Sequence, residues 1–224
     1  MLTIYGVPLS VHTRKVIVAA ILKGLDYTNE PVIPFDPPAD WRSLSPTGLI
    51  PAIRHDGFEL ADSAAICAYL ERVKPTPALY PAEPRALGRA LWLEQYGNAA
   101  LFRQVVHPLF HQLVIRPKIL QQGEADAGEV RRLTGEVAPG VFDYLEGEVA
   151  AGRLGTGALS IAEVTIASNL VNLGYLGISL DAARHPRLGA MLAGTVRHPA
   201  VEQALRAELP FVERLGLEPV AALA

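Results

Sequence analysis

The chain has 224 residues, enough for one large or two small domains with a sizeable hydrophobic core. Its net charge of −3 offers no basic surface for nucleic acid or an anionic membrane. A single cysteine excludes an internal disulfide and fits a reducing, cytoplasmic compartment. No apolar run reaches the length of a membrane span, and the N-terminus lacks the basic start of a signal peptide.

The opening residues predict a strand, a helix and a second strand. Leu2–Tyr5 alternates and carries β-branched side chains, as a short strand does. Ser10 or Thr13 is placed to cap a helix that continues to about Lys23. Residues 27–33 follow as the second strand, which completes a βαβ unit.

The next signal is the stretch Ser45-Pro46-Thr47-Gly48-Leu49-Ile50-Pro51-Ala52-Ile53. Pro51 sits between two apolar pairs, and a proline cannot donate to a sheet ladder. A trans bond is the commoner state, but a tight turn with a cis Ile50–Pro51 bond, entering a strand at Ala52, fits the apolar pattern better. Such a bend leaves the backbone N–H and C=O of Ile50 free to pair with an extended peptide.

A short hairpin and a helix follow this turn. Asp56 and Gly57 form the dipeptide of a tight hairpin turn. Asp62 and Ser63 then stand at the start of a helix predicted over residues 64–73, and the start of a helix favours an anion. The chain therefore continues as a ββα unit.

A proline-rich linker at residues 77–84 separates this first part from a second part that reads as helix throughout. Pro108, Pro117 and Pro139 predict bends or breaks within the longer helices. Four predicted helical segments are residues 85–122, 126–151, 185–195 and 199–205.

The cleanest local signal is the run from Leu159 to Val164. Ser160 can cap a helix, Glu163 can reach back to it three residues later, and Leu159 can pack on Val164. The helix that follows, predicted over residues 161–173, is apolar with small side chains, so we expect it to be the core of the second part. We assign this capping box a role in folding only.

The order of these features resembles the glutathione transferase superfamily, from Leu2 to about Leu205. The matching pieces are the proline turn, the hairpin, the acidic-Ser pair that opens a helix, and the later capping motif. The resemblance implies an α+β N-terminal thioredoxin-like domain (βαβ then ββα) at residues 1–76. It also implies an all-α helical-bundle C-terminal domain at residues 85–224, a homodimer, and glutathione as co-substrate.

Thioredoxin-like redox proteins carry two cysteines at the start of the first helix, where this chain has Ser10-Val11-His12-Thr13. Any thiol must therefore arrive with glutathione. In members with serine between a proline and an arginine at this place, the serine hydroxyl bonds the glutathione sulfur. That role carries over to Ser10, between Pro8 and Arg14, where a helix start and a hydroxyl donor lower a thiol pKa. Two alternatives stay open: Ser10 is only a cap, or Thr13 is the donor.

The resemblance also implies contacts to the rest of the glutathione peptide. Asp62 and Ser63 match the pair that holds the γ-glutamyl amine and carboxylate, although a cap alone would also explain them. Ile50, before Pro51, would bond the cysteinyl part through its backbone. Leu49 departs from the Lys, Arg or Gln that often meets the glycine carboxylate. Three other residues are candidates to substitute for it: Trp41, Arg42 and His12.

The remaining residues of chemical interest have plainer interpretations. Cys67 lies within an apolar helix and reads as a small buried side chain. His107 and His111 are four apart, but further ligands for a metal are not evident, so no metal site is predicted. In this family the long helix faces the second-substrate pocket, which makes some of its residues candidates to line that pocket. For the apolar candidates, packing in the core is the stronger alternative. The pocket candidates are Phe102, His107, Phe110, His111 and Ile115.

These features together predict a glutathione transferase that binds glutathione as thiolate and conjugates it to a small hydrophobic electrophile, as in detoxification. The alternative is a non-catalytic relative that serves as a scaffold or ligand-binding protein. A cysteine-type reductase is disfavoured because Ser10 occupies the cysteine position. The sequence does not name the electrophile, since that pocket is built from variable helical side chains.

Overall fold

The computed structural model describes residues 1–219. Its four-stranded sheet has the order β2-β1-β3-β4. The strands are β1 (Leu2–Tyr5), β2 (Tyr27–Glu30), β3 (Ala52–His55) and β4 (Phe58–Ala61). β1 pairs in parallel with β2 and antiparallel with β3, and β3 pairs antiparallel with β4. β4 therefore runs in the same direction as β1, so the helices that follow these two strands begin at the same edge of the sheet.

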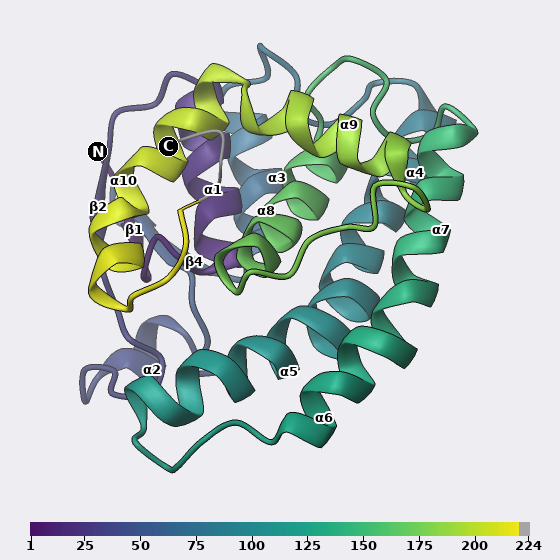
Figure 1. The fold of residues 1–224 in the computed structure, drawn as a ribbon. Helices are drawn as coiled ribbons and strands as arrows, with labels where there is room; N and C mark the ends of the chain where they lie inside the picture. The colour runs from purple at the N-terminus through teal and green to yellow at the C-terminus, as the bar shows by residue number, and fades with distance from the viewer. Residues whose placement is uncertain (220–224) are drawn as a thin grey trace.

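Two of the three helices of this first part pack on the sheet and on each other (Figure 1). The helices are α1 (Val11–Leu22), α2 (Trp41–Leu44) and α3 (Ser63–Val73). The apolar run over residues 16–22 predicts a buried segment, and in α1 residues 16–20 are buried while Ile21 and Leu22 are partly buried. Trp41 of α2 is buried in a small separate cluster with Val32 and Ala52. The predicted βαβ and ββα units are both present.

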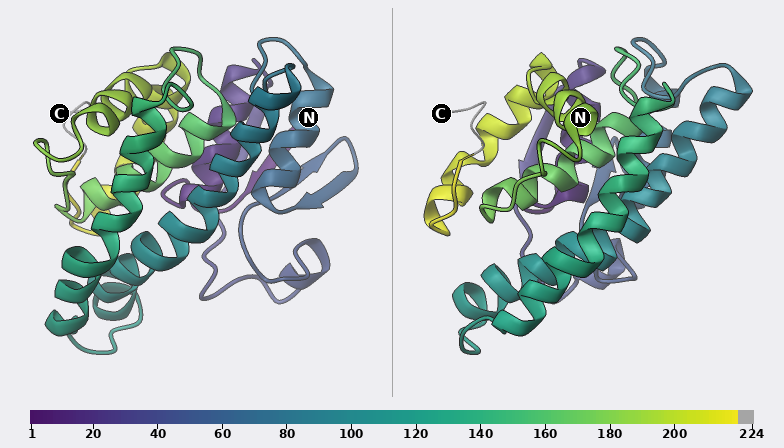
Figure 2. Two further views of the ribbon diagram at one scale, coloured as in Figure 1. Left: turned by 90° about the vertical axis from the view of Figure 1, so that its right-hand side faces the viewer. Right: turned by 45° about the vertical axis from the view of Figure 1, so that its right-hand side comes forward.

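Between residues 84 and 214 the second part consists of helices joined by loops. In the described residues it contains three π-helical stretches, labelled η, in which the turns are wider. Its elements in chain order are α4 (Pro84–Tyr96), η1 (Gly97–Val106), α5 (His107–Phe110), η2 (His111–Ile119), α6 (Ala127–Arg132), η3 (Leu133–Val137), α7 (Ala138–Ala150), α8 (Ile161–Tyr175), α9 (Pro186–Val196) and α10 (Pro199–Arg214). The segment from α4 to η2 and the segment from α6 to α7 lie side by side as two long rods (Figure 2).

The prolines of the long rods are accommodated without a break in the helix. η1 ends just before α5, which has Pro108 in its first turn, and Pro117 lies inside η2. η3 similarly ends just before Pro139 in the first turn of α7. A proline removes one backbone donor and crowds the carbonyl four residues earlier, and wider turns relieve both effects. The predicted bends therefore appear as local changes of helix type.

Helix α8 is the centre of the second part, as predicted. It packs against α1, α4, η1 and α9, and nearly all of its side chains are buried. The capping box is present: the Ser160 N–H donates to Glu163 Oε2 at 3.0 Å, and the Ala162 N–H donates to Ser160 Oγ at 3.2 Å. This pairing satisfies orphan donors at the start of a buried helix.

Two of the boundaries that differ from the predictions have a clear physical reason. β2 ends at Glu30 and does not continue to Ile33, because β1 ends opposite it at Tyr5 and Pro31 cannot donate to a ladder. α10 continues to Arg214, nine residues beyond the predicted end at Leu205. Its extension is favoured by tertiary packing, since Glu208 and Val212 are fully buried.

The Ile50–Pro51 peptide bond is cis, which confirms the prediction for the proline turn. Residues 220–224 of the predicted second domain lie outside the described residues. Within residues 1–219, no helix combines the length and the hydrophobicity needed to cross a bilayer.

Candidate functional site

The strand register brings the predicted site residues to one edge of the sheet. Tyr5 of β1 pairs with Ala52 of β3, and Ala52 pairs with Ala61 of β4. These three residues form a row across the sheet, at the edge where α1 and α3 begin. The site residues are the close chain neighbours of this row: Ser10, Ile50, Pro51, Asp62 and Ser63.

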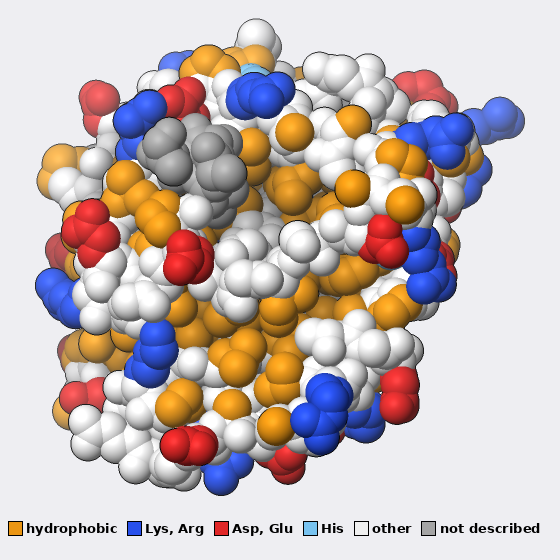
Figure 3. Space-filling model, in the orientation of Figure 1, with side chains coloured by type: hydrophobic (Ala, Val, Ile, Leu, Met, Phe, Trp, Pro, Cys, Tyr) orange, Lys and Arg blue, Asp and Glu red, His pale blue; other side chains and the backbone are white. Residues whose placement is uncertain are grey.

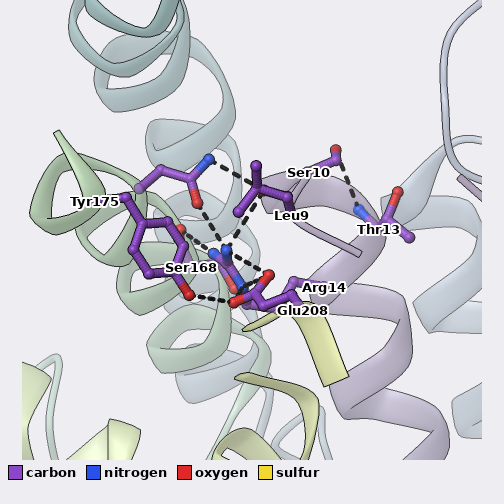
Figure 4. A network of polar contacts seen from close by, with 8 residues as sticks. Leu9, Ser10, Thr13, Arg14, Ser168, Tyr175 and Glu208 are labelled. Carbon is purple, nitrogen blue, oxygen red and sulfur yellow. Dashed lines mark hydrogen bonds and ion pairs between the residues drawn. The ribbon is translucent and has the colours of Figure 1, made fainter. Parts of the chain in front are cut away.

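Ser10 is the N-cap of α1, with an extended backbone (φ −67°, ψ 129°). Its Oγ accepts a long hydrogen bond of 3.5 Å from the Thr13 N–H (Figure 4). The side chain is partly exposed, and its proton is donated to none of the other residues in the range 1–219. Ser10 therefore caps the helix and keeps a donor for a group that enters from outside.

Thr13, the alternative hydroxyl, faces inward. The residue is fully buried, and its Oγ1 has no hydrogen-bond partner among the described residues. A Cβ on Gly6 would lie 2.5 Å from this oxygen and 3.2 Å from the Cβ of Ile50. Gly6 is thus a glycine because Thr13 and Ile50 fill the space beside it, and the turn covers the Thr13 hydroxyl.

The residue before the cis proline presents an unpaired stretch of backbone. Neither the N–H nor the C=O of Ile50 bonds to another residue of the described chain. The adjacent Leu49 is 66% exposed, while its carbonyl accepts a 2.7 Å bond from Ser45 Oγ. The short strand-like edge expected at Ile50 is present and open.

Asp62 is the N-cap of α3, and Ser63 is the first helical residue. Asp62 Oδ1 accepts from the N–H groups of Ala64 at 2.9 Å and Ala65 at 3.1 Å, which leaves Oδ2 outside the cap. The φ of Asp62 is +78°, a strained value for a residue with a side chain. Such strain is characteristic of sites where the surroundings fix a functional group. The Ser63 hydroxyl makes no hydrogen bond with the rest of residues 1–219.

Two of the three candidates for the Leu49 position lie beside the proline turn. Trp41 Nε1 donates to the carbonyl of Gly48 at 3.2 Å, so its only donor is already used. Arg42 Nη1 donates to the carbonyl of Pro46 at 3.1 Å, and its guanidinium lies against Gly48 on the exposed side. Arg42 is therefore the charged group nearest to Leu49 on this turn.

The third candidate, His12, contacts the helical part. Its ring packs edge-on against Phe102 of η1, with centroids 4.5 Å apart. The ring centroids of Phe102 and His107 are 5.5 Å apart, and those of His107 and His111 are 6.4 Å apart. This aromatic chain brings η1 and α5 to the start of α1, while the role of these residues in a second-substrate pocket stays a prediction. Ile115 is instead buried, which favours the core-packing interpretation for it.

On the face drawn in Figure 3, hydrophobic side chains gather in a strip between α8 and α5, and charged side chains lie mainly around the rim. The strip is of the kind an apolar substrate would contact.

Burial lowers the pKa of His12 to about 4, and the nearby charge of Lys15 adds to this effect. The pKa of His12 is lower in the folded protein than in the unfolded chain. As the pH falls below about 6.5, the unfolded chain therefore binds more protons than the folded protein. Stability present near neutral pH is therefore lost on acidification.

Between about pH 7.5 and pH 5 we expect the free energy of unfolding of the wild type to fall by about 2 kcal/mol more than that of His12→Gln. Urea unfolding at the two pH values measures this difference, and equal losses in both proteins would contradict it.

Cys67 is fully buried, and burial raises the pKa of its thiol to about 12. The side chain therefore packs as a small hydrophobic group, as predicted. In the described part of the chain, no three His, Cys, Asp or Glu side chains gather closely enough to hold a metal ion.

The sequence interpretation missed a buried polar network behind Ser10, which Figure 4 shows. Arg14 pairs with Glu208 of α10, with 2.9 Å between Nη2 and Oε2 and almost no exposure of either side chain. The only signal in the sequence is a pair of charges, Arg14 and Lys15, directly before the apolar run of this helix. Lys15 has an equally buried partner, with 2.8 Å between its Nζ and Glu94 Oε1.

Comparison with known proteins agrees with this geometry. The family model of the glutathione S-transferase N-terminal domain matches residues 4–78. A maleylacetoacetate isomerase of Pseudomonas aeruginosa is 32% identical over 210 residues, which cover 90% of this chain and 94% of the relative. Glutathione S-transferase 3 of Zea mays is 31% identical over 200 residues, covering 86% and 83%. A solved glutathione S-transferase of Rhodospirillum rubrum has a TM-score of 0.81 and 25% identity, with 92% of each chain covered.

The chain therefore belongs to the glutathione transferase superfamily. Its fold is the thioredoxin-like domain of that family followed by a mostly helical part, as predicted. Members of the family use glutathione as a co-substrate.

Proposed function

We propose that this protein is a glutathione transferase, which binds glutathione as a thiolate beside Ser10 and conjugates it to a small hydrophobic electrophile. The observation that carries the proposal is the meeting of three different groups at one sheet edge. They are the unused hydroxyl proton of Ser10, the free backbone of Ile50, and the Asp62–Ser63 pair at the start of α3.

These groups fit the chemistry of a short peptide thiol. The open N–H and C=O of Ile50 suit an extended peptide that pairs as an added strand. The free Oδ2 of Asp62 suits an amine, while the Ser63 hydroxyl and the start of α3 suit a carboxylate. We assign the glycine carboxylate to Arg42, since its guanidinium lies against Gly48, the residue before the exposed Leu49.

Bound glutathione supplies the sulfur nucleophile. Ser10 donates its hydroxyl proton to the sulfur, and the N-terminus of α1 adds a favourable dipole, so both stabilise the thiolate over the thiol. Thr13 is unsuited to this role because its oxygen is sealed beneath Gly6. The rings of His12 and Phe102 are in contact, and together they would form one wall that keeps the second substrate close to the sulfur.

A second candidate is an isomerase, which the similarity to the maleylacetoacetate isomerase of P. aeruginosa favours. The same activated thiol would serve an isomerase, because reversible addition of the glutathione thiolate to a conjugated double bond permits rotation about that bond. The two activities differ in glutathione balance: a transferase consumes one glutathione per product, and an isomerase consumes none. Thiol titration during turnover separates them.

The direct test of the proposed function combines retention on immobilised glutathione with turnover of a chloronitrobenzene. A transferase is retained, is eluted by free glutathione, and forms the thioether. Retention without turnover of this probe or of a conjugated cis-alkene would support the ligand-binding alternative. Absence of retention would contradict the proposal. We place the activity in the cytoplasm, where glutathione is the thiol buffer, and in a role in detoxification.

We also propose that two copies form a homodimer through α3, β4 and α4. These elements carry exposed large apolar side chains: Phe58 (47%), Val73 (40%), Leu91 (44%) and Trp92 (49%). A surface cavity between α3 and α4 is lined by Ala68, Tyr80, Leu87 and Leu91, among others. Exposed large apolar side chains on these elements are of the kind that a partner chain would bury. The two domains proposed for each copy are residues 1–76 and 85–224, joined by the linker at 77–84.

Light scattering tests the dimer. The wild type is expected at twice the chain mass of 24.1 kDa at micromolar concentration. Leu91→Arg places a charge on the proposed interface and is expected to give monomers. Leu120→Arg, at an apolar position that is 36% exposed on the other end of the long rod, is the matched control and should remain dimeric. A wild-type particle of single-chain mass would count against the dimer.

A further inference from the structure

The peptide group between Leu9 and Ser10 is fixed at both of its polar ends. Its N–H, on Ser10, donates to the carbonyl of Val7 at 3.0 Å. Its C=O, on Leu9, accepts from Asn172 Nδ2 at 3.2 Å and from Arg14 Nη2 at 3.4 Å. On the other side of Ser10, the carbonyl of Ser10 accepts from the Arg14 N–H at 2.8 Å. The backbone that carries the Ser10 hydroxyl is therefore restrained before and after this residue.

The donors to the Leu9 carbonyl are themselves held by the helical part (Figure 4). Arg14 Nη2 donates to Asn172 Oδ1 at 2.8 Å, and Arg14 Nη1 donates to the carbonyl of Ser168 at 2.6 Å. Arg14 Nε donates to Glu208 Oε1 at 3.0 Å, and the Tyr175 hydroxyl donates to the same oxygen at 2.6 Å. All of these side chains are buried, so water does not compete for their bonds.

Asn172 has a distinct place in this network. Its amide makes two hydrogen bonds, one to the Leu9 carbonyl and one from Arg14. It thereby connects α8, which is the core of the second part, to the residue immediately before Ser10. Arg14 carries several other bonds, and its loss would disturb the whole interface between α1, α8 and α10. Asn172 is therefore the residue at which the position of Ser10 can be tested with least disturbance elsewhere.

We propose that Asn172 is a positioning residue: through its bond to the Leu9 carbonyl, the helical part sets the place of the Ser10 hydroxyl relative to the bound sulfur. The inference rests on the proposed function of Ser10. A displacement of about 1 Å is enough to weaken a hydrogen bond to a charged sulfur and to reduce turnover. Neither the backbone of Ile50 nor the α3 start depends on Asn172, so glutathione should still bind.

The experiment compares Asn172→Leu, Asn172→Ala and Asn169→Leu in the full chain. Asn169 is the matched control. It is buried on the same helix, and among the described residues its side chain bonds only to the Thr165 carbonyl, at 2.9 Å within α8. Thiolate absorbance of bound glutathione against pH is the main readout, with kcat and KM as the second. The charged and titratable groups around the start of α1 are the same in all three proteins: His12, Lys15, Asp62, Arg103 and His107.

Both Asn172 variants are expected to raise the pKa of the bound thiol and to lower kcat by about tenfold near neutral pH, with KM for glutathione nearly unchanged. Asn169→Leu is expected to lose stability without moving the thiol pKa. The smaller alanine variant keeps the test valid if leucine prevents folding.

If Ser10→Ala raises the thiol pKa but both Asn172 variants behave like Asn169→Leu, the positioning role is overturned and the proposed function stands. If the wild type does not lower the thiol pKa at all, the proposed function fails and this inference fails with it.

Discussion

Replacing Glu208 by alanine is expected to destabilise the protein by about 3–5 kcal/mol, because it leaves the Arg14 guanidinium buried without its carboxylate. Glu208 has no exposed surface, and it accepts from both Nε and Nη2 of Arg14 and from the Tyr175 hydroxyl. Its removal leaves donors on two different helices without an acceptor. Chemical denaturation, followed by the free energy of unfolding, measures the loss.

Glu202→Ala is the matched control for this prediction. Glu202 lies on the same helix and pairs with Arg206, whose side chain is 62% exposed. Exposed pairs of this kind contribute about 0.3–0.5 kcal/mol, so the control should be nearly as stable as the wild type. The double variant Arg14→Met with Glu208→Ala should be less destabilised than the sum of its single variants, because the unpaired charge is gone. Equal stability of Glu208→Ala and Glu202→Ala would contradict the prediction that the buried pair of Arg14 and Glu208 stabilises the fold.

Ser10→Ala is expected to lower turnover by roughly tenfold to a hundredfold near neutral pH. A hydrogen bond to a charged acceptor contributes about 1.5–3 kcal/mol, and here it would be lost from the thiolate. The pKa of the bound thiol should rise, and the loss of activity should shrink as the pH rises, because the thiol then ionises without help. Affinity for glutathione should change little, since Ile50, Asp62 and Ser63 hold the rest of the peptide. Turnover and thiolate absorbance measured against pH check both parts.

Thr13→Ala is the control for the choice of hydroxyl. The Thr13 oxygen has no hydrogen-bond partner within residues 1–219 and lies beneath Gly6, so its removal should leave the absorbance curve in place. A curve that moves for Thr13→Ala and not for Ser10→Ala would show that the other hydroxyl is used. Ser10→Cys is expected to favour mixed disulfide formation over conjugation, since a cysteine at a helix start is an activated thiol.

Local chemistry made much of the fold predictable from the sequence. The capping box at Ser160 and Glu163, the cis bond before Pro51 and the Asp-Gly hairpin turn each depend on residues close together in the chain. The common sheet edge follows from them, because two antiparallel pairings return β4 to the direction of β1. The candidate site residues therefore lie close to one edge of the sheet, while their roles stay predictions.

Interactions between distant residues were not predictable in the same way. Arg14 and Glu208 are 194 positions apart, and nothing near either residue names the other. The sequence predicts an end of α10 at Leu205, whereas the helix continues past Pro210 to Arg214, with Glu208 and Val212 buried by tertiary packing. Likewise, the contact between His12 and Phe102 depends on how two separate helices pack.

The central claim is that glutathione binds at the shared edge of the sheet with its sulfur beside Ser10. A crystal structure of the protein with bound glutathione tests it most directly. The sulfur is expected within hydrogen-bond distance of Ser10 Oγ, the cysteinyl backbone paired with Ile50, and the γ-glutamyl group against Asp62 and Ser63. Glutathione bound elsewhere, or at this edge with its sulfur turned away from Ser10, would contradict the account.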